Sequence, residues 1–283
     1  MNNVSSTAQA ARLFDVGGRA FVVTGAASGL GLAIAQTLAA NGANLLLLDR
    51  DEDKLKETAA TLGKAATLCV LDVSDASAIQ AAVDEFTFKR GTVDGVFANA
   101  GVSGGPGFGT AMGATLGRLQ DQDADHWNQV LQINLLGVLH SMKAVIPAMK
   151  QARRGSIVIT ASVAGMQAES FVSYAYAAAK AAVIQLVHQS ALELAPFGIR
   201  VNGIAPGYVR TGIANGCLHD PDVEAGLVRR IPLGRLGEPH EIQGLALLLA
   251  SDAGSYLTGG LFPADGGVLL GTPVSNPSTN SLS

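Results

Sequence analysis

The stretch that decides the fold is Ala20–Asn41, with the sequence AFVVTGAASGLGLAIAQTLAAN. It opens with an apolar run, Ala20–Thr24, which is typical of a buried β-strand. The next segment, Gly25–Gly31, holds three glycines and leads into a helix expected over Leu30–Asn41. Glycines in such a turn allow a tight bend and close backbone approach to a diphosphate, whose charge suits a helix N-terminus. The stretch therefore predicts a strand, a nucleotide-binding turn and a helix.

An acidic residue further along supports nucleotide binding. Asp49 ends the next apolar run and lies 18 residues after Gly31. An acidic side chain at this place in a dinucleotide-binding unit accepts hydrogen bonds from the adenosine ribose hydroxyls. A 2′-phosphate would meet a like charge there, so Asp49 favours NAD over NADP. Arg50 is the competing feature, because an arginine next in sequence can accommodate that phosphate.

Outward from this unit, short apolar strands alternate with longer helical segments, which predicts a doubly wound, Rossmann-type parallel sheet of seven strands with helices on both faces. The strands are expected at 20–24, 44–49, 67–71, 95–98, 156–160, 200–204 and 261–263. The helices are expected at 30–41, 52–62, 77–89, 123–150, 174–196 and 239–250. We expect one Rossmann-fold domain over residues 19–270, an N-terminal arm over 1–18 and a flexible tail over 271–283.

Two loops are longer than is usual in α/β proteins. They run from Gly101 to about Gln122 and from Pro206 to about Gly237, and both follow strands at the carboxyl edge of the sheet. Their candidate wall residues are mostly apolar and allow a medium or bulky, largely apolar substrate, while Arg210 and His219 could meet a polar group. The apolar residues are Phe108, Met112, Leu116, Ile213, Leu218 and Leu227.

The stretch Gly155–Lys180 carries the candidate chemistry. Tyr176 and Lys180 are four residues apart on a predicted helix and so share one face. A phenol has a pKa of about 10, and a nearby ammonium is expected to lower that pKa towards neutrality. Ser162 follows the preceding strand, where its hydroxyl could hold a substrate oxygen while Tyr176 moves the proton. Tyr174 has no lysine on its face, because Ala178 stands four residues on.

Composition excludes several functional classes. The net charge of −4 over 283 residues gives no electrostatic footprint for nucleic acid. Cys69 and Cys217 match no metal spacing and are expected as reduced thiols in a cytoplasmic protein. The N-terminus does not resemble a secretory signal, and no apolar run is long enough to predict a membrane span. The five histidines show no metal-ligand spacing, so we expect no catalytic metal.

Several motifs occur in the order found in classical short-chain dehydrogenases/reductases, which the chain resembles from about Asp15 to Gly267. The motifs are TGAASGLG from Thr24, NAG at 99–101, Asn134, Ser162, Tyr176 with Lys180, PG at 206–207, IPLGRLGEP from Ile231 and LTGGLFPADGG from Leu257. The resemblance implies hydride transfer between NAD(H) and a secondary alcohol or ketone. It also implies pairing of the long helices around 130–149 and 175–194 into a homotetramer.

The resemblance also implies a role for individual residues. Tyr176 would be the general acid/base, Lys180 would hold the nicotinamide ribose, and Ser162 would position the substrate oxygen. Asn134 would hold a water that links Lys180 to solvent. Asp72 would contact the adenine, Asn99 would brace the central strand, and Thr211 would meet the carboxamide. The remaining implied cofactor residues are Gly25, Ser28, Gly29, Leu30, Gly31, Val73, Ala100, Gly101, Pro206, Gly207 and Val209.

Alternative interpretations remain open at several of these positions. Asn134 could instead cap a kink in a long helix, and Asp72 could be a helix N-cap. The separation of Ser162 and Tyr176 is slightly longer than the family often shows. The glycine-rich segment after Gly101 resembles an insertion that could shape the substrate pocket or decorate the surface. The chain as a whole could be a non-catalytic nucleotide sensor or scaffold. A halohydrin dehalogenase is disfavoured, because that class lacks the nucleotide-binding glycines and has arginine in place of Lys180.

Overall fold

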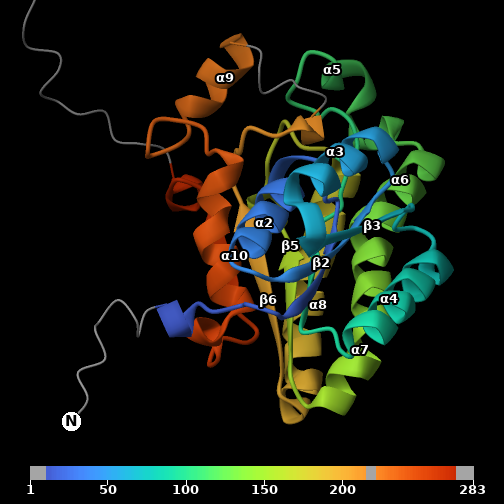
Figure 1. The fold of residues 1–283 in the computed structure, drawn as a ribbon. Coiled ribbons are helices and arrows are strands. Elements are labelled where there is room, and N and C mark those ends of the chain that lie inside the picture. The colour runs from blue at the N-terminus through green and yellow to red at the C-terminus, as the bar shows by residue number, and fades with distance from the viewer. Residues whose placement is uncertain (1–10, 215–220, 272–283) are drawn as a thin grey trace, which may run out of the picture.

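A single parallel sheet organises the computed structural model, which describes residues 11–214 and 221–271 (Figure 1). The seven strands of this part of the chain lie in the order β3-β2-β1-β4-β5-β6-β7. They are β1 (Ala20–Thr24), β2 (Asn44–Asp49), β3 (Ala66–Val70), β4 (Gly95–Ala98), β5 (Gly155–Thr160), β6 (Ile199–Pro206) and β7 (Leu261–Ala264). The strand order reverses between β1 and β4, which is where doubly wound sheets place their ligands. The predicted fold class is confirmed.

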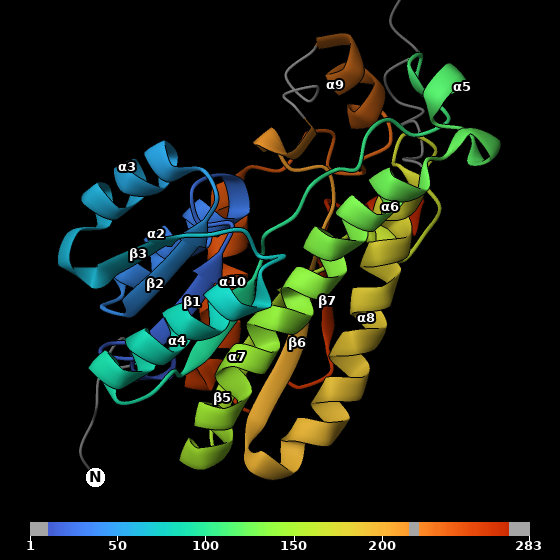
Figure 2. The ribbon, with the colours of Figure 1, turned by 90° about the vertical axis from the view of Figure 1, so that its right-hand side faces the viewer.

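Helices cover both faces of the sheet (Figure 2). One face carries α4 (Ala76–Arg90), α7 (Gly137–Ala152) and α8 (Tyr174–Leu194); the other carries α2 (Gly29–Ala40), α3 (Glu52–Leu62) and α10 (Gln243–Ala250). Short 3-10 turns occur at Gly63–Ala65, Leu119–Asp121, Val163–Gly165, Ala195–Phe197, Gly212–Ala214, Pro239–Ile242, Asp252–Gly254 and Val268–Leu270. Most predicted strands and helices thus exist, with ends that shift by one or two residues.

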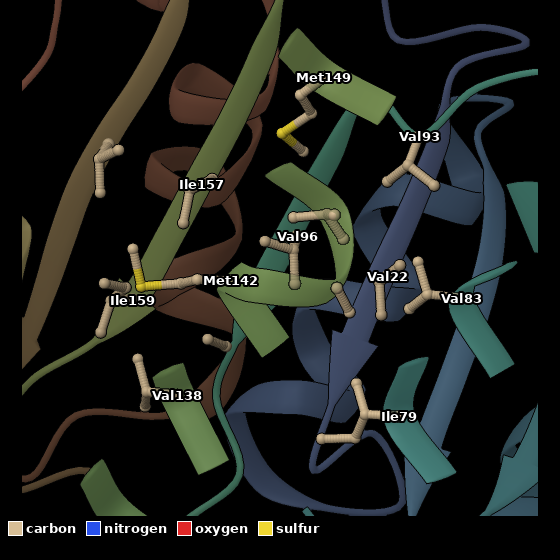
Figure 3. Packing of buried hydrophobic residues seen from close by; sticks show 14 of the residues in the cluster. Val22, Ile79, Val83, Val93, Val96, Val138, Met142, Met149, Ile157 and Ile159 are labelled. Carbon is tan, nitrogen blue, oxygen red and sulfur yellow. The ribbon is translucent and has the colours of Figure 1, made fainter. Parts of the chain in front are cut away.

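The inner strands are apolar on both sides because both of their faces are covered, whereas the edge strands β3 and β7 are partly exposed. In β1, Val22 packs on the side of α4 and α7, whereas Phe21 and Val23 pack on the side of α2. Figure 3 shows Val22 in a cluster with Met142 and Met149 from α7. Full burial of both strand faces explains why these strands are continuous apolar runs with no polar alternation.

The helix predicted over 123–150 is not regular. It consists of α6 (Ala124–Leu131), a π-helical turn at Gln132–Leu136 and α7. By length and composition alone, the continuous segment Ala124–Ala152 is apolar enough to cross a membrane, contrary to the sequence-based expectation of no such stretch. However, α7 packs its apolar side chains on the sheet, and 44% of the most apolar window is buried inside the protein. The core helix of a globular protein can be equally long and apolar.

Both long segments predicted as loops contain helices. The first includes α5 (Gly113–Leu116), and the second includes α9 (Pro221–Val228). Both stand above the carboxyl edge of the sheet (Figures 1 and 2). The expected arm over 1–18 also differs at its end, because Val16 is fully buried in the core on the α2 side. The expectations for Leu218, His219, Cys217, residues 1–10 and the tail from 272 lie outside the described residues.

Candidate active site

The turn between β1 and α2 is built by close backbone contacts. A Cβ at Gly31 would lie 2.0 Å from the Gly25 carbonyl oxygen, so only glycine lets the helix start this near the strand. Gly29 has a φ of +54°, in the left-handed region that favours glycine. Ser28 is the exposed N-cap of α2, and its side chain makes no capping hydrogen bond. The first N–H groups of α2 are therefore available to an anion, with Leu30 in the first turn.

Asp49 fixes this turn to the end of β2. Its carboxylate accepts hydrogen bonds from the backbone N–H of Ala27 at 2.9 Å and of Asp51 at 3.0 Å. Each carboxylate oxygen keeps a further lone pair for a ligand hydroxyl. Arg50 is exposed beside it. The structure thus places Asp49 at the turn that the sequence assigned to the nucleotide.

Asp72 lies exposed after β3 and is not a helix N-cap. Its carboxylate accepts from the Ser74 N–H at 2.8 Å, and this hydrogen bond holds the pKa of Asp72 below its usual value. The N-cap of α4 is Asp75, which accepts from the N–H groups of Ser77 and Ala78. The neighbouring Val73 is buried, and a Cβ at Gly137 of α7 would meet its side chain at 2.7 Å.

Asn99 joins three strands at their carboxyl ends. Its amide donates to the Thr24 carbonyl oxygen at 3.2 Å, and its carbonyl oxygen accepts from the Thr160 hydroxyl at 3.0 Å. The Thr24 hydroxyl in turn accepts from the N–H groups of Asn99 and Ala100. The sequence analysis missed Thr24 and Thr160; their one signal is that each is a polar residue at the end of an apolar run.

Asn134 sits fully buried in the π-helical turn. Its side chain accepts from the Val102 N–H at 3.0 Å and donates to the Val102 carbonyl oxygen at 2.9 Å. A Cβ at Gly101 would meet its carbonyl oxygen at 2.7 Å. Asn134 therefore holds the segment after β4 against the helix, and glycine at 101 is needed for that contact. One amide hydrogen and one lone pair remain for a further partner.

The three residues proposed for proton transfer are brought together. Ser162 follows β5, and its hydroxyl lies close enough to the phenol of Tyr176 on α8 to lower the pKa of that phenol. One turn further on, the buried ammonium of Lys180 donates to the Thr160 carbonyl oxygen at 2.7 Å and lies 5.6 Å from the Tyr176 ring centroid. Ser173, which the sequence analysis missed, caps α8 by accepting from the Tyr176 N–H at 3.3 Å.

The charges of this cluster differ from the sequence-based expectation. Burial raises the pKa of Tyr176 above 10, and the Ser162 hydroxyl offsets this in part. Burial also lowers the pKa of Lys180 to about 8. The expected lowering of the Tyr176 pKa by Lys180 is thus not found, because desolvation dominates and the ammonium donates to the Thr160 carbonyl oxygen. Tyr176 is a neutral phenol at pH 7.

The segment after β6 faces the glycine turn. Pro206 ends β6, Gly207 packs on Asp265, and Val209 pairs with Gly237. Thr211 lies opposite the turn, since a Cβ at Gly29 would be 3.4 Å from its side chain. A cavity of about 350 Å³ opens here, lined by Gly29, Leu32, Ala33, Gln36, Arg210, Thr211, Gly212, Pro239 and His240. Two predicted cofactor residues, Gly29 and Thr211, therefore share one cavity.

Arg210 is committed to other groups within the protein. Its guanidinium contacts both carboxylate oxygens of Glu224 on α9 at 2.7 and 2.6 Å and Glu238 at 3.0 Å. It thereby fastens α9 to the segment that precedes α10. The expectation that Arg210 meets a polar substrate group is not supported, because its donors already bind these two carboxylates.

The glycine-rich insertion lies beside the candidate site. Its backbone pairs with the segment that leads into α8, where Gly109 donates to the Ser170 carbonyl oxygen at 2.7 Å. Phe108 stacks on Tyr174 with ring centroids 5.7 Å apart. A Cβ at Gly113 would lie 1.7 Å from the Gly107 carbonyl oxygen. The glycines thus let the insertion fold back on itself next to the start of α8.

Comparisons with known proteins agree with this geometry. Residues 25–269 match the protein family described as enoyl-(acyl carrier protein) reductase. The oxidoreductase UcpA of Escherichia coli is 38% identical over 266 residues, covering 91% of this chain and 97% of that protein. A trans-4-hydroxycyclohexanecarboxylate dehydrogenase of Sinomonas cyclohexanicum is 38% identical over 262 residues, covering 88% of this chain and 92% of that protein.

Solved structures are similar over nearly the whole chain. A short-chain type dehydrogenase/reductase from Mycobacterium marinum has a TM-score of 0.81 and 32% identity, covering 90% of this chain and 97% of that one. A gluconate 5-dehydrogenase from Burkholderia cenocepacia, in complex with NADP and tartrate, has a TM-score of 0.83 and 32% identity, covering 92% of this chain and 99% of that one. The similarity therefore includes the sheet, both helical layers and the carboxyl edge.

Proposed function

Because the chain belongs to the short-chain dehydrogenase/reductase family, as its motifs predicted, we propose that it transfers a hydride between NAD(H) and a secondary alcohol or ketone. Its relatives are oxidoreductases, which supports an enzyme. The observation that carries the finer proposal is the cluster of Ser162, Tyr176 and Lys180 at the carboxyl edge of the sheet. A purely nucleotide-sensing protein has no physical need for that cluster.

The residues present fit a nicotinamide dinucleotide. The close turn at Gly31 and the open first turn of α2 suit a diphosphate, and Asp49, which is bonded to the same turn, would accept hydrogen bonds from ribose hydroxyls. Gly29 and Thr211 line the cavity beside this turn. When bound, the nicotinamide supplies or takes up a hydride at its C4 carbon.

Tyr176 supplies the proton in the proposed mechanism. In ketone reduction, the Ser162 hydroxyl donates a hydrogen bond to the substrate oxygen and Tyr176 gives that oxygen its phenolic proton. The phenolate is then stabilised by the ammonium of Lys180, and solvent returns the proton through the region of Asn134. Because burial keeps the Tyr176 pKa above 10, the phenol is ready to donate at neutral pH. Alcohol oxidation requires the phenolate instead, so its rate should rise as the pH rises towards that pKa.

A substrate panel tests the function directly. The purified protein is mixed with NAD and secondary alcohols, or NADH and the matching ketones, and absorbance of the reduced nicotinamide is followed. We expect turnover for some members in both directions. Cofactor binding without turnover across the panel would favour the alternative function, a nucleotide sensor or scaffold.

We also propose a homotetramer. The outer surface of α8 carries Leu192, whose side chain is 78% exposed and is not covered by the sheet. Sedimentation at micromolar concentration should give four times the mass of one chain, because such surfaces are buried when helices pair about two-fold axes. A monomer under these conditions would contradict the proposal, and Leu192→Asp is expected to weaken the assembly.

A further inference from the structure

A second, polar cavity lies over the carboxyl ends of β5, β6 and β7. Its volume is about 190 Å³, enough for part of a small molecule, and it is lined by Gln167, Ala168, Glu169, Tyr208, Arg230, Val268 and Gly271. Gln167–Glu169 follow Ser162 on the same connection, and Tyr208 follows the Pro206–Gly207 motif. Four lining residues thus come from the connections that carry Ser162 and Thr211, and Arg230, Val268 and Gly271 complete the cavity.

Glu169 is the unusual residue of this cavity. Its side chain is only 2% exposed, and a carboxylate this deeply buried needs partners. One of its oxygens, Oε1, accepts from the Tyr208 hydroxyl at 3.0 Å and from the Gln167 amide at 2.6 Å. The other, Oε2, lies 3.7 Å from Nη1 of Arg230, which is beyond hydrogen-bond distance. Oε2 is thus near a positive charge but is not directly bonded to it.

Aromatic contacts connect the two charged groups. The guanidinium of Arg230 lies 5.3 Å from the Phe171 ring centroid, within the range of a cation–π contact. Phe171 in turn packs edge-on against Tyr208, with ring centroids 5.3 Å apart. Because Tyr208 also binds Glu169, the carboxylate and the guanidinium are positioned by one connected set of side chains. These contacts link the buried carboxylate of Glu169 to the guanidinium of Arg230, whose side chain is 48% exposed.

We propose that Glu169 and Arg230 form a subsite for a second hydroxyl group of the substrate, remote from the carbon that is oxidised or reduced. An oxygen about 2.8 Å from each atom fits across a gap of 3.7 Å. A hydroxyl can accept from Nη1 of Arg230 and donate to Oε2 of Glu169 at the same time. The preferred substrate is thus a hydroxylated ketone or a diol, in contrast to the largely apolar substrate that the loop sequences allowed.

Other chemical groups fit this pair less well. A substrate carboxylate would be attracted by Arg230 but repelled by the buried charge of Glu169, and Asp265 lies near the same pocket through Tyr208. A substrate ammonium group would be attracted by Glu169 but repelled by Arg230. An apolar group would displace water from Oε2 of the buried Glu169 and from Arg230 without replacing the hydrogen bonds of that water, which is costly at a buried carboxylate.

The test compares matched substrates and rests on the proposed oxidoreductase function. One series contains hydroxyketones with the hydroxyl at increasing distance from the carbonyl, together with 4-hydroxycyclohexanone; the other contains the same ketones without the hydroxyl. Values of kcat/KM with NADH are measured for the wild type, for Glu169→Gln and for Glu85→Gln. Glu85 is an exposed residue on α4 that pairs with Lys89, so its variant controls for the loss of one carboxylate.

We expect the wild type to prefer at least one hydroxyketone over its partner by about tenfold or more, because a buried polar subsite rejects a ligand that leaves it unpaired. Glu169→Gln should remove most of that preference, mainly through KM, and change the deoxy ketone by less than about threefold. NADH binding should stay normal. If Glu169→Gln lowered kcat/KM equally for both series, the subsite would be refuted and Glu169 would have a purely structural role. A wild type that does not prefer any hydroxyketone would also refute the subsite. Failure of every ketone to react would instead contradict the proposed function itself.

Discussion

Replacing Tyr176 with phenylalanine should lower kcat by at least about 10²-fold while leaving NADH affinity near the wild-type value. The phenol is the group that exchanges a proton with the substrate oxygen, and general acid–base catalysis contributes about 10²–10⁴-fold to a rate. The aromatic ring, which packs beside Lys180, is retained in the variant. Steady-state kinetics on any accepted ketone and fluorescence titration with NADH measure the two effects separately.

Tyr174→Phe is the matched control, since Tyr174 lies two residues earlier on α8. Its ring stacks on Phe108 of the glycine-rich insertion, and stacking does not need the hydroxyl. The control should therefore keep most of the wild-type rate. A Tyr176→Phe enzyme with a third of the wild-type kcat would refute the assignment, and so would equal losses in the two variants.

NAD should be preferred over NADP by about 100-fold or more in kcat/KM, which corresponds to about 2.7 kcal/mol. The carboxylate of Asp49 is held at the glycine turn by hydrogen bonds from the N–H groups of Ala27 and Asp51. It therefore cannot easily move away from a 2′-phosphate. Two unit charges about 4 Å apart repel by roughly 4 kcal/mol at an effective dielectric near 20, before salt screening. Initial rates with each cofactor measure the ratio.

Asp49→Ser should reduce this preference and leave Arg50 free to assist NADP. The substitution also removes the acceptor for the Ala27 N–H, which loosens the turn for both cofactors. Asp49→Asn separates these effects, because it removes the charge but keeps one carbonyl oxygen as an acceptor. Equal efficiency of the wild type with NAD and NADP would show that Arg50 governs the pocket. The gluconate 5-dehydrogenase of similar structure binds NADP, which makes the comparison informative.

The fold and the family were predictable from short-range patterns. Local geometry can be predicted from residues that are close in sequence. Examples are the apolar run Ala20–Thr24, the glycines at 25, 29 and 31, and the spacing of Tyr176 and Lys180. The strand ends were also well predicted, because parallel strands buried on both faces must be apolar throughout. The first and last apolar residues of such a run therefore mark the ends of the strand closely.

Features that depend on distant partners were not predictable in the same way. Glu169 and Arg230 are 61 residues apart, and only the packing of α9 over the carboxyl edge brings them together. The pKa of Tyr176 was predicted in the wrong direction, because burial is a property of the assembled layers and not of the Tyr176–Lys180 spacing. The short helix α5 was missed because its segment is rich in glycine, which disfavours helices locally.

The central position of β1 affects the order in which the sheet can form during synthesis. β1, β2 and β3 can pair once residue 70 has been made, but the other edge of β1 stays open until β4 (Gly95–Ala98) follows. At roughly 5–20 residues per second, the intervening residues take a ribosome about one to five seconds. An unpaired strand edge is prone to intermolecular pairing during that interval. The segment made meanwhile is α4, whose Ile79 and Val83 pack in the same cluster as Val22, so the chain produces a cover for the exposed face of β1 before the strand that closes its edge.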